Sequence, residues 1–139
     1  MPTQAEKVAQ FQRLHEADGA FLIPNPWDIG SAVRLQSLGY PALATTSSGF
    51  AFTLGRMDMQ VTLDEKIEHC RQLAASTTVP VNADLEKGFA DEPDGVADCI
   101  RRAAATGLAG ASIEDATGDK AKPIYDFSYA VERLSLIHI

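Results

Sequence analysis

The feature that most constrains how this chain folds is a regular alternation of short apolar segments with amphipathic, helix-like segments. Each apolar segment is too short for a typical helix and is bounded by turn residues, as expected for a strand that is covered on both faces. Strands that alternate with helices pair in parallel through right-handed crossovers. The predicted strands are residues 20–23, 42–46, 79–83 and 109–113.

Capping signals and one-sided apolar stripes predict the helices. Thr3 with Glu6, and Thr62 with Glu65, have the spacing of capping boxes. Pro93 falls in the first turn of a further helix, where its missing N–H group is tolerated. The predicted helices are residues 3–17, 29–38, 63–76, one from about 93 that stops at 107 and one that begins at 126 or 127, with a polar loop over residues 47–61.

Acidic or small polar residues directly follow each predicted strand. Polar groups at the carboxyl ends of successive parallel strands are typical of the active-site rim of a (β/α)8 barrel, which needs eight such units in roughly 250 residues. We therefore expect an α/β fold, the N-terminal half of a TIM-type barrel with about four βα units after an N-terminal helix. A doubly wound sheet fits the same pattern, but no GxGxxG or GxxxxGK[ST] loop follows the first strand.

The expected domain is a truncated barrel over residues 1–134. After Leu134 the sequence changes abruptly to an apolar, β-prone end without a helix cap. We interpret residues 135–139 as a non-native tail joined to a truncated reading frame, with a genuine short C-terminus as the alternative. Four strands cannot close a barrel, so the 139-residue chain is expected to be inactive by itself.

Composition excludes several classes of function. The net charge of −7, from 12 basic and 19 acidic residues, argues against a nucleic-acid surface. The sequence has neither a signal region nor an apolar run long enough to cross a bilayer, so a cytoplasmic protein is expected. Cys70 and Cys99 lie on apolar helix faces without metal-ligand spacing and are interpreted as small buried hydrophobes.

Carboxylates at neighbouring strand ends predict a metal site. Asp84 and Glu86 follow the third predicted strand, and Glu114 follows the fourth. Carboxylates that converge in one pocket repel each other unless a cation balances them, and hard oxygen ligands suit Mg²⁺ or Mn²⁺. Asp58, in the loop after the second strand, is a possible fourth acid. The alternative is that these residues are ordinary loop and capping acids.

Other strand ends carry candidate substrate-binding groups. Ser48 and Gly49 form a turn whose backbone N–H groups suit a carboxylate or phosphate oxygen. Trp27 either walls the pocket or merely packs, and Asp28 either binds substrate or caps the next helix. Lys120, in a loop after the fourth strand, could reach over the pocket and stabilise an enolate oxygen, or be a solvated loop lysine.

An ordered set of segments gives the chain a family resemblance. It resembles the isocitrate lyase / phosphoenolpyruvate mutase superfamily, which includes the 2-methylisocitrate lyases and carboxyphosphonoenolpyruvate mutase-like proteins. The resemblance implies an α/β barrel, a homo-oligomer, a Mg²⁺ ion, and a C–C or P–C bond made or broken through an enolate-like pyruvate species. It covers most of residues 21–134 and is carried by residues 27–32, 48–49, 54–58, 82–89, 107–110 and 113–115.

The resemblance also implies a role for each candidate residue. Asp84 matches the direct metal ligand, and Lys120 matches the lysine of a gating loop that closes over a small α-oxo or α-hydroxy carboxylate. The remaining matches are Asp58, Glu86 and Glu114, as acids that hold the metal largely through water, and Ser48 with Gly49, as the turn that binds the substrate carboxylate.

Two departures from the family pattern narrow the expected chemistry. Glu86 stands where many members have Asp, and the loop reads Lys120-Ala121-Lys122, without the Cys of the lyases or the Asn of the mutase. Isocitrate or methylisocitrate cleavage and phosphonate chemistry are therefore not favoured. Cleavage of an oxaloacetate-like acid or of another substituted malate stays open, and so does a non-catalytic relative that binds a carboxylate metabolite.

Overall fold

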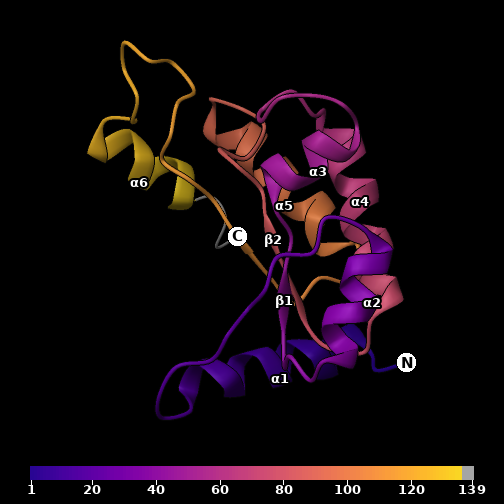
Figure 1. The fold of residues 1–139 in the computed structure, drawn as a ribbon. Coiled ribbons are helices and arrows are strands. Elements are labelled where there is room, and N and C mark those ends of the chain that lie inside the picture. Colours follow the sequence, from indigo (N-terminus) through magenta and orange to yellow (C-terminus); the bar gives the residue numbers. More distant parts are fainter. Residues whose placement is uncertain (136–139) are drawn as a thin grey trace.

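A computed structural model describes residues 1–135 as helices arranged around a small parallel sheet (Figure 1). The strands pair in the order β1-β2-β3, and β2 runs parallel to both of its neighbours. The strands are β1 (Leu43–Ala44), β2 (Val81–Asp84) and β3 (Gly110–Ser112), and the helices are α1 (Gln4–Glu16), α2 (Ile29–Ser37), α3 (Ser47–Thr53), α4 (Leu63–Ser76), α5 (Pro93–Ala104) and α6 (Phe127–Ser135).

Local sequence signals fix most of these boundaries. The side chains of Thr3 and Thr62 accept hydrogen bonds from the N3 backbone amides of α1 and α4, and both predicted capping boxes are formed. Pro93 is the first residue of α5, as predicted. Ser135 is the last residue of α6, while the rest of the suspected tail lies outside the described residues.

The first predicted strand is wrong. Residues 20–23 are extended but form no ladder, and a single backbone hydrogen bond, from Ala44 N to Pro24 O at 3.0 Å, ties this segment to β1. Pro24 and Pro26 have no N–H groups to donate, so regular pairing cannot continue beside β1. Leu22 is 72% exposed, so the segment also lacks a cover on one side.

The predicted loop over residues 47–61 contains a helix that the sequence reading missed. Ser47–Thr53 forms α3, and the side chain of Thr46 caps it by accepting from Gly49 N at 3.2 Å. The Ser-Ser-Gly segment was interpreted as a turn, but the same small polar residues also suit a helix N-terminus. The helix places the backbone of Ser47–Gly49 directly after β1.

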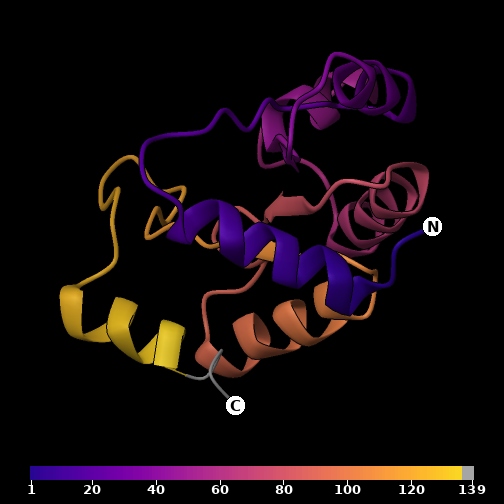
Figure 2. The same ribbon diagram turned by 90° about the horizontal axis from the view of Figure 1, so that it is seen from below.

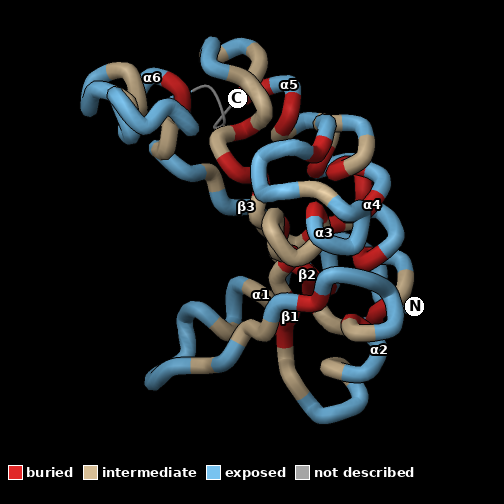
Figure 3. Tube along the Cα trace, turned by 45° about the horizontal axis from the view of Figure 1, so that its top comes forward, coloured by how far each residue is buried: buried red, intermediate tan, exposed pale blue. Residues whose placement is uncertain are grey.

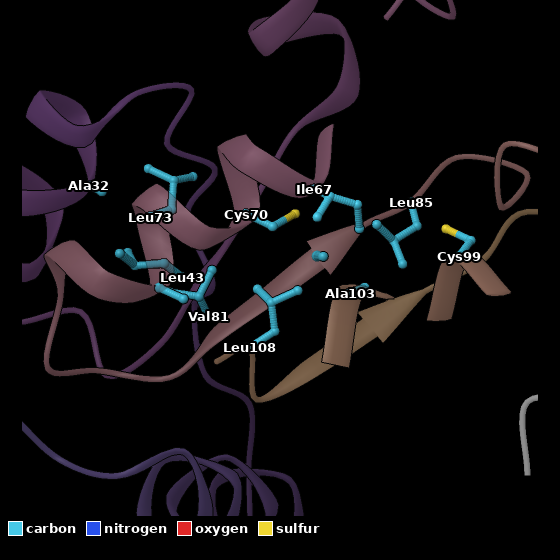
Figure 4. Close-up of a cluster of buried hydrophobic side chains, with 12 residues drawn as sticks. Ala32, Leu43, Ile67, Cys70, Leu73, Val81, Leu85, Cys99, Ala103 and Leu108 are labelled. Carbon is cyan, nitrogen blue, oxygen red and sulfur yellow. The ribbon is translucent and has the colours of Figure 1, made fainter. Parts of the chain in front are cut away.

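The hydrophobic core lies between the sheet and the helices α4 and α5 (Figure 4). Cys70 and Cys99 are both fully buried in it, which confirms their interpretation as small hydrophobes. Buried residues gather along β1 and β2 and on the inner faces of these helices, whereas the loop before α6 is largely exposed (Figure 3). Within residues 1–135, no helix is long and apolar enough to cross a membrane.

Helix α1 crosses the end of the sheet at which the strands begin (Figure 2). Lys7 Nζ donates to the carbonyls of Ala74 and Thr77 at 2.6 and 2.7 Å, and the Gln4 side chain donates to Ala104 O and Leu108 O. These are carbonyls at the C-terminal ends of α4 and α5 and just before β2 and β3. The opposite end, where the strands finish, carries the predicted polar residues.

Candidate active site

Asp84, the last residue of β2, is held by two backbone amides and one side-chain hydroxyl. Its Oδ2 accepts from Ser47 N at 2.9 Å and its Oδ1 accepts from Glu86 N at 3.0 Å. Its own N–H group donates to Thr45 Oγ1 at 3.0 Å. The carboxylate therefore has a fixed position between the carboxyl ends of β1 and β2 and keeps lone pairs for a further partner.

Glu86 occupies a tight turn that links the other acids. Its φ of 50° is in the left-handed region, which is unusual for a residue other than glycine. Its carbonyl accepts from Glu114 N at 2.8 Å. Burial raises the pKa of Glu86 to about 7, with further increases from the charges of Asp58, Asp84 and Glu114 and an opposing effect of Lys66.

The carboxylates share one electrostatic field but do not form a compact ligand group. Loss of solvent raises the pKa of Glu114, and the charges of Asp84 and Asp58 raise it further. Among residues 1–135, however, no three His, Cys, Asp or Glu side chains are grouped closely enough to hold a metal ion directly. The structure therefore does not bring Asp84, Glu86 and Glu114 together as direct ligands, since Asp84 bonds backbone amides and Glu114 is exposed, and the metal site stays a prediction.

Lys66 is a buried charge that sequence reasoning missed. It lies in α4, is 1% exposed, and its Nζ has no hydrogen-bond partner among the described residues. Burial lowers its pKa, while the charges of Cys70, Asp84 and other acids act in the opposite direction. The signal was present in the sequence, because Lys66 falls within the apolar stripe formed by Leu63, Ile67 and Cys70.

His69 connects α4 to the segment before α2. Its Nε2–H group donates to the carbonyl of Trp27 at 2.9 Å, and its ring stacks on Phe50 of α3 with centroids 3.8 Å apart. Burial is the main cause that lowers the pKa of His69 to about 4. The local sequence pattern around His69 gives no sign of this stacked contact.

The buried His69 predicts a loss of stability in acid. Its folded-state pKa of about 4 lies below the usual value of 6.5, so its contribution is complete above pH 6.5 and is lost as the pH falls toward 4. We expect a loss of about 3 kcal/mol in unfolding free energy across that range. Urea unfolding at pH 7 and pH 4.5 should show a smaller loss for His69→Gln than for the unmodified protein. An equal loss in both would contradict the assignment.

The segments that carry the predicted substrate-binding residues lie beside Asp84 and His69. The Gly49 amide bonds to Thr46 Oγ1, whereas the Ser48 amide has no hydrogen-bond partner among the described residues. A Cβ atom on Gly49 would lie 2.5 Å from Thr46 Cγ2 and 3.4 Å from Trp27 Cβ, so only glycine fits without displacing the cap. Trp27 is half exposed, and Asp28 caps α2 by accepting from Ser31 N at 2.7 Å.

Lys120 is exposed in a loop that is closed by its own hydrogen bonds. Thr117 N donates to Pro123 O at 3.0 Å, and Ala121 N donates to Asp119 Oδ1 at 2.8 Å. A Cβ atom on Gly118 would lie 2.9 Å from Met59 Cε, so the loop touches the segment that carries Asp58. The loop that bears Lys120 thus lies against the rim, but within residues 1–135 the Lys120 side chain forms no ion pair or hydrogen bond with Asp58, Asp84, Glu86 or Glu114.

The donor set fits a hard divalent cation. Glu86 Oε1 is buried and has no hydrogen-bond partner among the described residues, which leaves it free to face a cation. Burial and the neighbouring carboxylates raise the pKa of Glu86. Oxygen donors with excess negative charge suit Mg²⁺ or Mn²⁺, and Mg²⁺ usually keeps several of its waters. Well-spaced acids of this kind could therefore hold the ion partly through water.

Comparisons with known proteins bear on the family and the fold of this chain. The chain matches the family model of phosphoenolpyruvate phosphomutase over residues 11–138. A candidate lyase/mutase of Burkholderia cenocepacia J2315 superposes with a TM-score of 0.94 at 48% identity, over 96% of this chain and 48% of that chain. A 2,3-dimethylmalate lyase, a member of the PEP mutase/isocitrate lyase superfamily, superposes with a TM-score of 0.84 at 27% identity, over 99% of this chain and 48% of that chain.

This chain also covers less than half of a relative found by sequence similarity. An uncharacterized protein of Mycobacterium tuberculosis strain H37Rv is 35% identical over 111 residues, which are 79% of this chain and 42% of that protein. The chain thus spans about half the length of the relatives that it matches. Its architecture is that of the N-terminal half of a TIM-type barrel, which confirms the predicted fold class and resemblance.

Proposed function

Because this chain belongs to the phosphoenolpyruvate phosphomutase family, we propose that the whole protein is a Mg²⁺-dependent, lyase-like enzyme. It cleaves a C–C or P–C bond of a small α-oxo or α-hydroxy carboxylic acid through an enolate-like pyruvate species, and Mn²⁺ is an alternative ion. The single observation that carries the proposal is Glu86 Oε1, which is buried, has no hydrogen-bond partner within residues 1–135 and lies among other acids at the strand ends.

Each residue of the site has a task in this proposal. Asp84 would bind the ion directly, while Asp58, Glu86 and Glu114 would hold it largely through water. The ion would supply Lewis-acid stabilisation of the negative charge that develops on the substrate oxygen.

The rest of the site orients the substrate and excludes water. The amides of Ser48 and Gly49 face the substrate carboxylate, and the Gly49 amide gives up its hydrogen bond to Thr46 in order to donate to the substrate. Trp27 covers one wall of the pocket beside Asp28. Lys120 closes the site and neutralises developing negative charge. A half-exposed Trp27 is in keeping with a residue that a substrate would cover.

The whole protein needs a second half to work. The edge of β3 that faces away from β2 has no strand beside it in residues 1–135, and Ala111 and Ser112 are exposed. A cavity of about 500 Å³ lies between this edge and the helices α1 and α5, away from the carboxylates. Further βα units would cover both, so we propose that the 139-residue chain alone is inactive. A homo-oligomer in the cytoplasm completes the proposal.

The rival function is that of a non-catalytic relative that binds a carboxylate metabolite. The observation in its favour is Lys120-Ala121-Lys122, which lacks an acid/base side chain in a loop that is closed on itself. It predicts metal and ligand binding without turnover.

One experiment separates the two functions. The whole protein is titrated with Mg²⁺ and Mn²⁺ by calorimetry and then mixed with a panel of oxaloacetate-like acids and substituted malates. We expect product formation, followed by chromatography, that EDTA abolishes and Mg²⁺ restores. Binding of an acid without product favours the rival, and metal-independent turnover contradicts the proposed role of the acids. The 139-residue chain serves as the control that should form no product.

A further inference from the structure

Lys66 and Glu86 each bury a charged group that has no partner. Lys66 is 1% exposed and Glu86 is 5% exposed. Within residues 1–135, neither Lys66 Nζ nor Glu86 Oε1 has a hydrogen-bond partner. An uncompensated buried charge is strongly unfavourable, and the most direct relief is an opposite charge nearby.

The register of α4 directs Lys66 toward Glu86. Lys66 lies one turn before Cys70, which is fully buried and faces the sheet (Figure 4). Helix α4 begins at the end of the sheet where β2 finishes and runs back toward the start of β2 (Figure 1). Side chains on a helix lean toward its N-terminus. The Lys66 side chain is therefore directed along the sheet toward the turn that contains Glu86.

Glu86 is also the residue that connects the other acids. Its N–H group donates to Asp84 Oδ1 at 3.0 Å, and its carbonyl accepts from Glu114 N at 2.8 Å. A partner that fixes the Glu86 side chain therefore also steadies the turn between Asp84 and Glu114.

We propose that Lys66 is a built-in counter-ion of the acidic site, whose ammonium pairs with Glu86 and competes with the metal for that carboxylate. Asp84, Asp58 and Glu114 would hold one divalent cation, while Glu86 would be shared between the waters of the ion and Lys66. Lys66 is thus a positioning residue, which acts through Glu86. The consequence for the metal rests on the proposed function, whereas the pairing of Lys66 with Glu86 does not.

The pairing is tested without any metal, by a double-mutant cycle in urea on the whole protein in EDTA. Lys66→Met and Glu86→Gln should each promote unfolding, because each leaves the other charge buried alone. Each variant raises the unfolding equilibrium constant by some factor. The factor for the double variant should be at least about tenfold smaller than the product of the two single-variant factors. Lys7→Met is the matched control, since Lys7 is also buried but bonds to the carbonyls of Ala74 and Thr77. When Lys7→Met is combined with Glu86→Gln, the unfolding equilibrium constant should change by the product of the two single effects. The same result for Lys66→Met combined with Glu86→Gln would overturn the pairing.

The consequence for the metal is tested by Mn²⁺ titration. Lys66→Met removes a positive charge and frees Glu86, so Mn²⁺ should bind about tenfold more tightly. A merely structural lesion would weaken binding instead. Lys66→Arg, which keeps the charge, and Lys7→Met should bind as the unmodified protein does. Weaker or unchanged binding by Lys66→Met would overturn this part of the inference.

The two tests keep failure of the inference apart from failure of the proposed function. If Asp84→Asn leaves Mn²⁺ binding intact, the metal proposal fails while the urea cycle still reports on the pair. If Lys66→Met does not refold, acetylation of Lys66 in Glu86→Gln, measured by mass spectrometry against Lys7, decides the question. A severalfold faster reaction of Lys66 supports the pair, and an unchanged ratio of the two rates overturns it.

Discussion

Replacing Asp84 by Asn should lower the metal-dependent kcat/KM of the whole protein by at least about a thousandfold, because the proposed direct ligand of the ion loses its charge. Asn keeps the size of the side chain, and its oxygen can still accept a hydrogen bond from one of the two amides, of Ser47 and Glu86, that donate to Asp84. The expected loss is therefore mainly chemical. Steady-state kinetics over a range of Mg²⁺ concentrations measures it.

Asp94→Asn is the matched control for Asp84. Asp94 is an exposed acid in the first turn of α5, and its replacement should leave kcat/KM unchanged. Circular dichroism and the melting temperature establish that both variants are folded. Metal-dependent activity of Asp84→Asn within tenfold of the unmodified protein would remove Asp84 from the site.

Replacing Arg133 by Met should detach α6 and cost about 3 kcal/mol in unfolding free energy. Arg133 is 1% exposed and donates to Asp91 O at 3.0 Å, to Ala90 O at 2.8 Å and to Lys87 O. Its guanidinium lies 4.0 Å from the centre of the Tyr125 ring. Met fills much of the same space but donates no hydrogen bond, so buried carbonyls lose their partner.

The effect of Arg133→Met should be concentrated in one part of the chain. Hydrogen exchange, followed by mass spectrometry, should accelerate in α6 and in the loop that carries Lys120, and change less in α4. Arg101→Met serves as the control, because Arg101 is exposed and forms only a surface ion pair with Asp98. Uniform acceleration over all the helices, or none in α6, would show that Arg133 does not anchor this segment.

Local patterns in the sequence predicted most of the fold. Capping boxes at Thr3 and Thr62 and the proline at the start of α5 are encoded in a few neighbouring residues, so they were predicted correctly. The strand over residues 20–23 failed for a different reason. Its apolar pattern is genuine, but pairing also needs N–H groups in register with a neighbour, and Pro24 and Pro26 cannot supply them.

The candidate site was predicted in its parts but not in its geometry. Asp84 and Glu86 were placed at the end of a strand, which the structure confirms for Asp84. Asp28 acts as the cap of α2, one of the two roles that the sequence allowed. Lys66 and His69 were missed because a helical pattern shows which face a residue occupies but not what the opposite wall contains.

The sequence by itself determined the alternation of strands and helices, the acidic character of the strand ends and the family, because these are written in contiguous residues and their order. Only the tertiary structure decided that Lys66 Nζ and Glu86 Oε1 are buried without hydrogen-bond partners among residues 1–135, that His69 stacks on Phe50, and that Arg133 fastens α6 to the loop after β2. Burial and charge compensation depend on residues brought together from distant parts of the chain, and no local pattern records which of them meet.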